Sequence, residues 1–408
     1  MNKSKFVIEG LGRKKALSGT IAVRGAKNAI LKALAASILF EDEVEFKNVP
    51  EIEDVRRMRE LLVGLKQNPE LHRDIAERLR ASIVLTGPVL ARYGEVTFPF
   101  PGGCVLGERP IDLFLDGYRA MGAEIVENDG LFIIKGKLRG AHIFFPFVSV
   151  TATETLMLAA TLAEGRTILE NAAMEPEIDS LAGYLNTCGA HIDGAGTPTL
   201  KIEGGGILRA NGRPYITPPD RIETGSFLIL AALAGHDVKI VDCEPKHSAA
   251  LLSLLARAGI KFEIGESSIS LRQGLTLPQA VSVRTHEYPG FPTDLQATMA
   301  VFLTQAEGEA TILETIFDGR FRYAEDLARM GADIEVLNPH KVRIRGPRAL
   351  SAQELEGPDL RAGLAYILAA TVAEGTSVVN NAYIIDRGYL AIEERLSKLG
   401  LNIKREQI

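Results

Sequence analysis

The sequence has few cysteines, no excess of positive charge and no long apolar run, and each shortage narrows the possible classes of protein. Its three cysteines, Cys104, Cys188 and Cys243, are too few for a disulfide framework and lack the spacing of metal ligands. The net charge of -6 argues against a nucleic-acid or membrane-surface partner, which would normally present a basic face. Apolar runs reach only about 10 to 15 residues, shorter than the roughly 20 needed to span a bilayer. We therefore expect no metal site and no membrane-spanning segment.

The beginning and the length of the chain suggest its compartment and its domain count. No basic-then-apolar leader is visible, because Met1-Asn-Lys-Ser-Lys5 runs directly into the strand-like Phe6-Val-Ile-Glu9. The predicted compartment is therefore the cytoplasm. With 408 residues, of which 46% are hydrophobic, the chain is long enough for two domains that each have a core.

A glycine followed by a short β-prone stretch recurs along the chain. The five copies begin at Gly122, Gly189, Gly259, Gly331 and Gly400, and their spacings are 67, 70, 72 and 69 residues. A period of this length indicates that each repeat is a supersecondary unit that buries its apolar face only against its siblings. The chain holds about six such units. We expect the shared residues to serve packing, and function to lie where the copies differ.

A typical repeat reads helix, strand, helix, strand, turn, strand. Its first helix is apolar on nearly every face, as in residues 154–163, 226–233 and 363–370. Because such a helix must be surrounded by protein, the pattern predicts an α/β fold with interior helices and outer sheets. Six units over two domains give three repeats each, which makes a two-domain inverse α/β barrel. The first repeat is the weakest, since residues 61–72 lack the glycine hairpin.

Three prolines, Pro214, Pro218 and Pro219, mark the midpoint and the expected crossover between domains. We expect one domain to comprise residues 1–22 and 219–408, and the other to comprise residues 23–218. The first would carry Asp294, Arg320, Arg361 and Arg387, and the second Lys27, Arg80, the Cys104 loop and Arg109.

Charged and polar groups that packing does not require stand where the first helices of the repeats begin. They are Lys27-Asn28, Arg80, Ser149, Asp220-Arg221, Asp294 and Asp359-Leu-Arg361. For Asp220, Asp294 and Asp359 taken alone, N-capping of the helices is the favoured explanation. It does not explain the cations, because a cation at a helix N-terminus opposes the helix dipole. The whole set indicates a shared anionic ligand, to which Arg320 and Arg387 could add from loops.

A second unusual segment, residues 98–110, surrounds Cys104 with paired glycines and prolines. That composition favours a mobile surface loop, and such loops often carry function. Free cysteines are usually buried small hydrophobes, and this interpretation suits Cys188 and Cys243. Cys104 lies close to Arg109, and a thiol near cations loses its proton more readily. We therefore expect a chemical role for Cys104.

Taken together, these motifs resemble the enolpyruvyl transferases over nearly the whole chain. The matching motifs are Gly25-Ala-Lys-Asn28, Arg80-Ala-Ser82, Gly102-Gly-Cys104, Arg109-Pro-Ile-Asp-Leu113, Ala163-Glu-Gly165, Asp220-Arg-Ile-Glu-Thr-Gly225, Phe291-Pro-Thr-Asp294, Arg320-Phe321, Asp359-Leu-Arg361 and Ile385-Asp-Arg-Gly-Tyr389. The family fold is a pair of three-repeat domains with buried helices, which agrees with the repeat pattern. The cysteine loop favours the members that act on a UDP-sugar over 5-enolpyruvylshikimate-3-phosphate synthase, which is similar in fold but lacks such a cysteine.

The resemblance implies a reaction and a set of reacting groups. The enolpyruvyl group of phosphoenolpyruvate would pass to the 3-hydroxyl of UDP-N-acetylglucosamine with release of phosphate, as the first committed step of peptidoglycan synthesis and without a cofactor. Asp294 would accept the hydroxyl proton, while Cys104 would either protonate C3 or hold phosphoenolpyruvate covalently. The implied cations for phosphoenolpyruvate are Lys27, Arg109, Arg320, Arg361 and Arg387, of which Lys27 and Arg387 join the catalytic set.

The resemblance also implies residues around the nucleotide sugar. They are Arg80, Arg109, Pro110, Ile111, Asp112, Leu113, Phe147, Val148, Ser149, Val150 and Ile316. Asn28 and Asp359 are further implied substrate-binding residues. The chain departs from the usual family pattern here. Phe147 stands where a lysine is common, Thr151 replaces a glycine, and Phe114 and Ile384 replace histidines. Loss of an exposed cation would weaken nucleotide binding by about 1 kcal/mol.

Two alternatives remain open from the sequence. The first keeps enolpyruvyl transfer but changes the acceptor to another nucleotide sugar or to shikimate 3-phosphate, because of Phe147 and Phe114. The second is a non-catalytic nucleotide-sugar sensor on the same scaffold. The presence of Cys104, Asp294 and all the cations disfavours the sensor. The oligomeric state cannot be predicted from the sequence.

Overall fold

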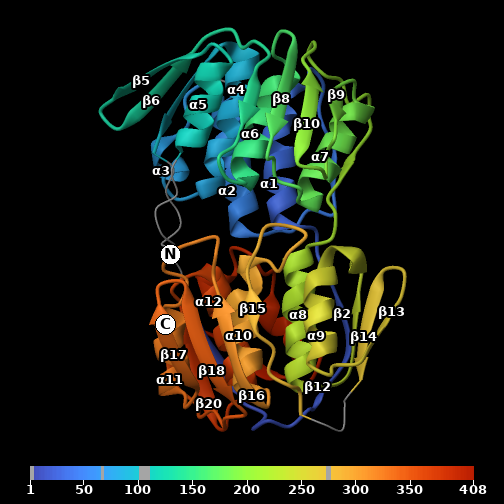
Figure 1. The fold of residues 1–408 in the computed structure, drawn as a ribbon, viewed down its shortest axis with the longest axis vertical. Helices are drawn as coiled ribbons and strands as arrows, with labels where there is room; N and C mark the ends of the chain where they lie inside the picture. Colours follow the sequence, from blue (N-terminus) through green and yellow to red (C-terminus); the bar gives the residue numbers. More distant parts are fainter. Residues whose placement is uncertain (1–3, 66–68, 101–110, 273–276) are drawn as a thin grey trace. The chain divides into compact units, whose positions relative to one another are not determined.

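The computed structural model describes residues 4–65, 69–100, 111–272 and 277–408. They form two compact units (Figure 1). The C-terminal unit combines the chain up to Arg24 with Pro219–Ile408, and the central unit comprises the described residues between Gly25 and Pro218. Between residues 24 and 25 and between residues 218 and 219, the described chain passes from one unit to the other. Each unit ties its ends together by a backbone hydrogen bond, from Asp220 N to Arg24 O (2.9 Å) in one and from Ala26 N to Pro218 O (2.7 Å) in the other.

In the C-terminal unit, three buried helices pack on one another inside three four-stranded sheets. Helices α8 (Arg221–Ala234), α10 (Gln296–Gln305) and α12 (Leu360–Val372) are buried along nearly their whole length, as their all-round apolar sequences require. The sheet orders are β13-β14-β12-β2, β15-β16-β18-β17 and β19-β20-β1-β21. The strands are β1 (Ser4–Glu9), β2 (Leu17–Ala22), β12 (Gly235–Val241), β13 (Phe262–Ile264), β14 (Ser268–Arg272), β15 (Val283–Arg284), β16 (Gly308–Leu313), β17 (Asp333–Asn338), β18 (Lys341–Gly346), β19 (Glu354–Glu356), β20 (Thr376–Asn380) and β21 (Asn402–Gln407).

The central unit repeats this plan with sheets of four, three and two strands. Its interior helices are α1 (Lys27–Ala36), α4 (Thr86–Tyr93) and α6 (Val150–Thr161) (Figure 1). The sheet orders are β7-β8-β10-β9, β4-β6-β5 and β11-β3. The strands are β3 (Phe46–Lys47), β4 (Glu95–Pro99), β5 (Glu124–Asn128), β6 (Leu131–Lys135), β7 (His142–Phe144), β8 (Arg166–Glu170), β9 (His191–Asp193), β10 (Thr199–Glu203) and β11 (Tyr215–Ile216). Among the described residues, the first repeat contributes a single strand to these sheets, the short β3.

The glycines that mark the repeats share one backbone conformation. Each follows the second helix of its repeat, and their φ angles are 89° at Gly122, 104° at Gly189, 85° at Gly259, 104° at Gly331 and 99° at Gly400. Only glycine adopts this left-handed region without strain, so it ends the helix and turns the chain into the next strand. The second helices are α2 (Glu53–Leu65), α5 (Asp112–Ala120), α7 (Pro176–Thr187), α9 (Ala249–Arg257), α11 (Tyr323–Arg329) and α14 (Ile392–Ser397).

The predicted fold is confirmed: the protein is a two-domain α/β structure in which each unit surrounds three interior helices with sheets. Short elements complete it, namely α3 (Arg73–Ala76), α13 (Ala382–Ile385) and the 3-10 helices η1 (Ser37–Leu39), η2 (Arg80–Leu85), η3 (Pro245–Ser248) and η4 (Thr293–Leu295). Within the described ranges, no helix has the length and apolar character needed to cross a membrane.

Candidate functional site

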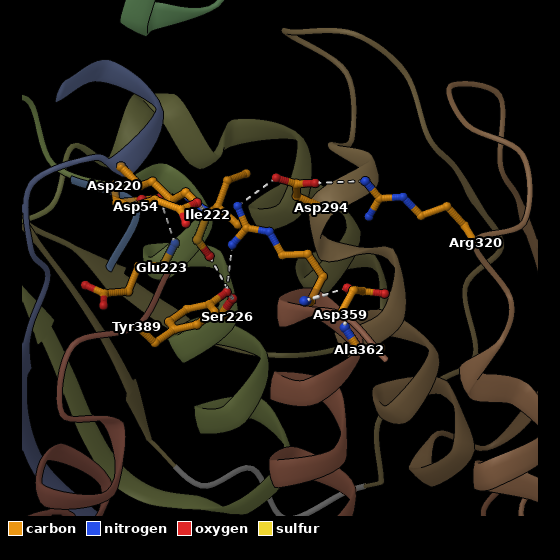
Figure 2. Close-up of polar contacts among 12 residues, drawn as sticks. Asp54, Asp220, Ile222, Glu223, Ser226, Asp294, Arg320, Asp359, Ala362 and Tyr389 are labelled. Atoms are coloured by element: carbon orange, nitrogen blue, oxygen red, sulfur yellow. Dashed lines mark hydrogen bonds and ion pairs between the residues drawn. The ribbon is translucent and has the colours of Figure 1, made fainter. Parts of the chain in front are cut away.

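An aspartate lies between two buried arginines in the C-terminal unit (Figure 2). The Asp294 carboxylate accepts a hydrogen bond from Arg320 Nη2 at Oδ1 (3.1 Å) and another from Arg361 Nη2 at Oδ2 (2.7 Å). Both arginines are 8% exposed. Two cations thus share the Asp294 carboxylate, and guanidinium groups of this kind suit a ligand carboxylate or phosphate.

The three residues reach this point from separate segments. Asp294 lies in η4, directly before the interior helix α10, and Arg361 is the second residue of α12. Arg320 follows β16 in a turn that leads to α11. Because the N-termini of interior helices meet at one end of the unit, residues far apart in sequence become neighbours.

The structure separates the capping aspartates from the one that does not cap. Asp220 accepts from Ile222 N (2.8 Å) and Glu223 N (3.0 Å) at the start of α8. Asp359 caps α12 in the same way, accepting from Arg361 N (2.7 Å) and Ala362 N (3.1 Å). Asp294 instead directs its carboxylate at two guanidinium groups (Figure 2). Capping therefore accounts for Asp220 and Asp359 but not for Asp294.

Arg361 also donates a hydrogen bond to a tyrosine, which in turn contacts a serine. Arg361 Nη1 donates to the Tyr389 hydroxyl (3.0 Å), which lies 3.1 Å from Ser226 Oγ. Burial alone would lower the pKa of Arg361, but Asp294 and Tyr389 outweigh it and raise that pKa above its ordinary value. Burial raises the pKa of Tyr389, although Arg361 opposes the shift. Arg361 is therefore a permanent cation, and Tyr389 remains a neutral donor.

Arg320 has one buried donor that no acceptor among the described residues satisfies. This donor is Nε, which is inaccessible, while the guanidinium lies 5.1 Å from the centre of the Phe317 ring. Buried donors are normally satisfied, so this nitrogen is an exception. Because Nε is inaccessible, it does not by itself indicate a ligand.

Arg387 and Ile316 lie half-buried in loops of the same unit. Arg387 comes directly after Asp386, the residue that ends α13. The Asp386 carboxylate makes a two-pronged ion pair with Arg405 of β21, with N–O distances of 2.8 and 2.6 Å. The backbone next to Arg387 is therefore fixed by the last strand of the chain.

In the central unit, Lys27 begins α1 and pairs with an aspartate that the sequence analysis did not single out. Lys27 Nζ lies 2.5 Å from Asp54 Oδ2, and both side chains are nearly inaccessible. Asn28, the next residue, is half-buried, and Arg80 begins η2 with its guanidinium 5.9 Å from the Phe100 ring centre. Asp54 lies in the first turn of α2, a position where acidic residues are common.

Two groups of the predicted nucleotide residues, 111–113 and 147–150, lie at two helix starts in the central unit. Ile111 precedes α5, whose first turn holds Asp112 and Leu113. Ser149 caps α6 by accepting from Ala152 N (3.3 Å), and the preceding Phe147 is 53% exposed. An exposed ring of this kind is available for ligand contact. The remaining expectations, for Cys104, Arg109 and Pro110, lie outside the described residues.

Comparison with known proteins decides the family. The model of the EPSP synthase (3-phosphoshikimate 1-carboxyvinyltransferase) family matches residues 11–396. The chain belongs to this family. A relative from Coxiella burnetii (strain Dugway 5J108-111), named UDP-N-acetylglucosamine 1-carboxyvinyltransferase, is 42% identical over 409 residues, covering 95% of this chain and 94% of its own. A relative of the same name from Magnetococcus marinus is 44% identical over 408 residues, covering 95% and 97%.

Solved structures support the fold. The enolpyruvyl transferase NikO from Streptomyces tendae superposes with a TM-score of 0.88 at 23% identity over 100% of both chains. The resemblance inferred from the motifs is thereby confirmed at the level of family and fold. Among the described residues, no group of three or more His, Cys, Asp or Glu side chains is arranged to hold a metal ion.

Proposed function

We propose that the protein transfers the enolpyruvyl group of phosphoenolpyruvate to the 3-hydroxyl of UDP-N-acetylglucosamine and releases phosphate, as a step of peptidoglycan synthesis. The observation that carries the proposal is the Asp294 carboxylate held between Arg320 and Arg361. The full-length relatives named for this reaction support the choice of acceptor.

The charges of this cluster match the proposed chemistry. Phosphoenolpyruvate carries a phosphate and a carboxylate, and two buried guanidinium groups can bind them through charge-assisted hydrogen bonds. The hydroxyl of the acceptor attacks C2 as C3 gains a proton and becomes a methyl group. The tetrahedral adduct then loses phosphate from C2 and a proton from C3, which restores the carbon–carbon double bond of the enolpyruvyl group. Asp294 accepts the hydroxyl proton, because an ionised carboxylate held by two cations keeps a fixed position and free lone pairs.

The other predicted residues complete the proposal. Lys27, Arg109 and Arg387 bind phosphoenolpyruvate, and Lys27 and Arg387 also take part in catalysis. Cys104 protonates C3 or holds phosphoenolpyruvate covalently. The proposed nucleotide-sugar ligands are Arg80, Arg109, Pro110, Ile111, Asp112, Leu113, Phe147, Val148, Ser149, Val150 and Ile316. Asn28 and Asp359 are further proposed substrate-binding residues. The proposed compartment is the cytoplasm.

Phosphate release from phosphoenolpyruvate tests the proposal across a panel of acceptors. UDP-N-acetylglucosamine should support turnover, and shikimate 3-phosphate should support none above background. Faster turnover with another nucleotide sugar than with UDP-N-acetylglucosamine would show that the proposed acceptor is wrong. Binding of nucleotide sugar without phosphate release would indicate a sensor.

The role of Cys104 has a separate test. Mass spectrometry after incubation with fosfomycin, an epoxide that alkylates thiols, should show one adduct on Cys104 and protection by phosphoenolpyruvate. The two other cysteines are internal controls, because both are buried and free. Burial raises the pKa of the Cys243 thiol to about 11, which keeps it protonated and unreactive. Labelling of Cys188 or Cys243 instead would refute the assignment.

A further inference from the structure

Glu314 is a buried carboxylate that none of the proposed catalytic steps uses. It follows β16 and is 1% exposed. Its Oε1 accepts from Thr285 Oγ1 (3.0 Å), Ile316 N (2.8 Å) and Phe317 N (3.2 Å). Its Oε2 accepts from Thr293 Oγ1 (2.8 Å). A carboxylate that is both buried and fully satisfied is an organising centre, because each donor is fixed relative to the other three.

Three of the four donors lie on the segments that carry the proposed reacting groups. Thr293 directly precedes Asp294, while Ile316 and Phe317 begin the loop that leads to Arg320. The Phe317 ring in turn lies 5.1 Å from the Arg320 guanidinium. The contacts therefore close a ring: Glu314 holds Phe317, Phe317 lies under Arg320, Arg320 binds Asp294, and Asp294 is joined through Thr293 back to Glu314.

A third segment joins the same centre. Thr285, which follows β15, accepts from Thr315 N (2.9 Å) and receives a second hydrogen bond from Thr315 Oγ1 at its carbonyl (2.6 Å). The first residues of the Arg320 loop are thus clamped between Glu314 and the end of β15. Loops are usually more mobile than the strands they connect, and these hydrogen bonds restrain the start of this one.

We propose that Glu314 is a positioning residue for enolpyruvyl transfer, which sets the distance between the proton-accepting Asp294 and the anion-binding Arg320. The inference rests on the proposed function, since it assigns those two roles. Glu314 itself touches neither substrate in this account. It acts through Thr293 on one side and through the Ile316–Phe317 backbone on the other.

Thr293→Val is the sharpest test, because valine has the shape of threonine and removes only the hydroxyl that joins Glu314 to the Asp294 segment. A small displacement of a reacting group can lower turnover by up to about 10²-fold. We expect kcat to fall about tenfold, with the KM for each substrate within about twofold of the original, because Asp294 acts in the chemical step.

Two substitutions of Glu314 separate shape from charge. Glu314→Gln keeps every contact: its Oε1 still accepts three hydrogen bonds, and the Thr293 hydroxyl can rotate to accept from the amide nitrogen. Turnover should stay within about threefold of the original. Glu314→Asp keeps the charge but is one methylene shorter, so it should lose at least about tenfold in kcat. The reverse order would contradict a positioning role and point to the charge itself.

Thr298→Val is the matched control. Thr298 lies in α10, and the one hydrogen bond of its hydroxyl to the described residues is to the Leu295 carbonyl at the end of η4 (2.9 Å), so its loss affects the same region without touching Glu314. Loss of the Thr298 hydroxyl should lower the free energy of unfolding by as much as the Thr293→Val substitution does, but it should leave kcat unchanged. If Thr293→Val and Glu314→Asp both turn over at the original rate, or if Thr298→Val loses as much activity as Thr293→Val, the inference is overturned.

Amide hydrogen exchange keeps this test separate from that of the reaction. Thr293→Val should speed exchange at Ile316 and Phe317, and Thr298→Val should not. Faster exchange in a protein that releases no phosphate with any acceptor would uphold the coupling through Glu314 and refute the proposed function. Unchanged exchange and unchanged kcat in an active protein would refute the coupling alone.

Discussion

Asp294 and Arg361 are 67 residues apart in sequence, yet Asp294 Oδ2 lies 2.7 Å from Arg361 Nη2. That separation equals the interval between the repeat glycines Gly122 and Gly189. The two residues therefore occupy similar places, near the starts of interior helices in neighbouring repeats. The repeat architecture brings equivalent helix ends together, and the differences between copies supply the opposite charges.

Arg361→Lys should impair phosphoenolpyruvate binding more than folding. Arg361 uses Nη2 for Asp294 and Nη1 for Tyr389, and a single ammonium group cannot reproduce this fork. We expect the KM for phosphoenolpyruvate to rise at least about tenfold, which corresponds to roughly 1.4 kcal/mol. Arg345→Lys is the control, because Arg345 pairs with Glu309 and Asp333 on an accessible sheet surface and should stay within about twofold. Equal effects of the two substitutions would contradict a special role for Arg361.

The Lys27–Asp54 pair should show strong coupling in stability. Asp54→Asn leaves a nearly inaccessible ammonium group beside a neutral amide, and breaking a buried pair in this way costs about 3–5 kcal/mol. The double variant Lys27→Met with Asp54→Asn should be less destabilised than the sum of the single variants, because no buried charge then remains. Urea unfolding of the four proteins measures the coupling. Additive losses would mean that the two charges do not interact.

Glu154 predicts a pH dependence of stability. It lies on α6 with its Oε2 3.2 Å from Lys32 Nζ of α1. Burial raises the pKa of Glu154 from 4.5 to about 7, with Lys32 opposing the shift and Glu177 and Glu175 adding to it. Because the folded state binds this proton more tightly, the stabilisation is complete below pH 4.5 and is lost as the pH rises through about 7.

Glu154→Gln should remove the loss of stability that Glu154 causes as the pH rises. Relative to the original protein, the variant should gain free energy of unfolding between pH 5 and pH 8, by up to roughly 3 kcal/mol at about 1.4 kcal/mol per pKa unit. Glu164→Gln is the control, since a hydrogen bond and the charge of Lys137 lower the pKa of that exposed carboxyl. It should show no change over the same interval. A pH profile shared by Glu154→Gln and the original protein would rule out Glu154 as the source.

The repeat pattern was enough to predict the fold and the helix ends that carry charge. It could do so because all-round apolar helices and left-handed glycines are local signals, visible within a few residues of sequence. The pattern could not distinguish Asp294 from Asp220 and Asp359, since each stands near the start of a helix. Only the tertiary positions of Arg320 and Arg361 show that Asp294 does not cap.

Asp54, Glu314 and Arg405 were missed for a related reason. Asp54 resembles an ordinary first-turn acid of α2, and Arg405 an ordinary cation on a terminal strand. Glu314 gave a weak signal, since an acid followed a buried strand and preceded the Arg320 loop. Their partners come from other segments, so spacing along the chain carries little information about these contacts.

Gly87 should be intolerant of a side chain. It lies in α4, where a Cβ atom would come 2.3 Å from the Thr155 carbonyl oxygen of α6. Both helices are interior, so the backbones would have to separate, and Gly87→Ala should cost at least about 1–3 kcal/mol. Gly183 in α7 has no atom within 4 Å of the corresponding position. Gly183→Ala should therefore stabilise the protein by about 0.5–1 kcal/mol through helix propensity. Thermal unfolding shifts of the same sign in both variants would contradict this account of helix packing.

The turnover of Asp294→Asn tests the central claim most directly. Asparagine keeps the size of the side chain and one acceptor for the arginines but cannot take up the proton of the acceptor hydroxyl. With phosphoenolpyruvate and UDP-N-acetylglucosamine as substrates, we expect kcat to fall at least about 10²-fold, while the Kd for the nucleotide sugar stays within about threefold. A variant that releases phosphate at nearly the original rate would show that the proton leaves by another route and that the Asp294 cluster is not the reacting centre.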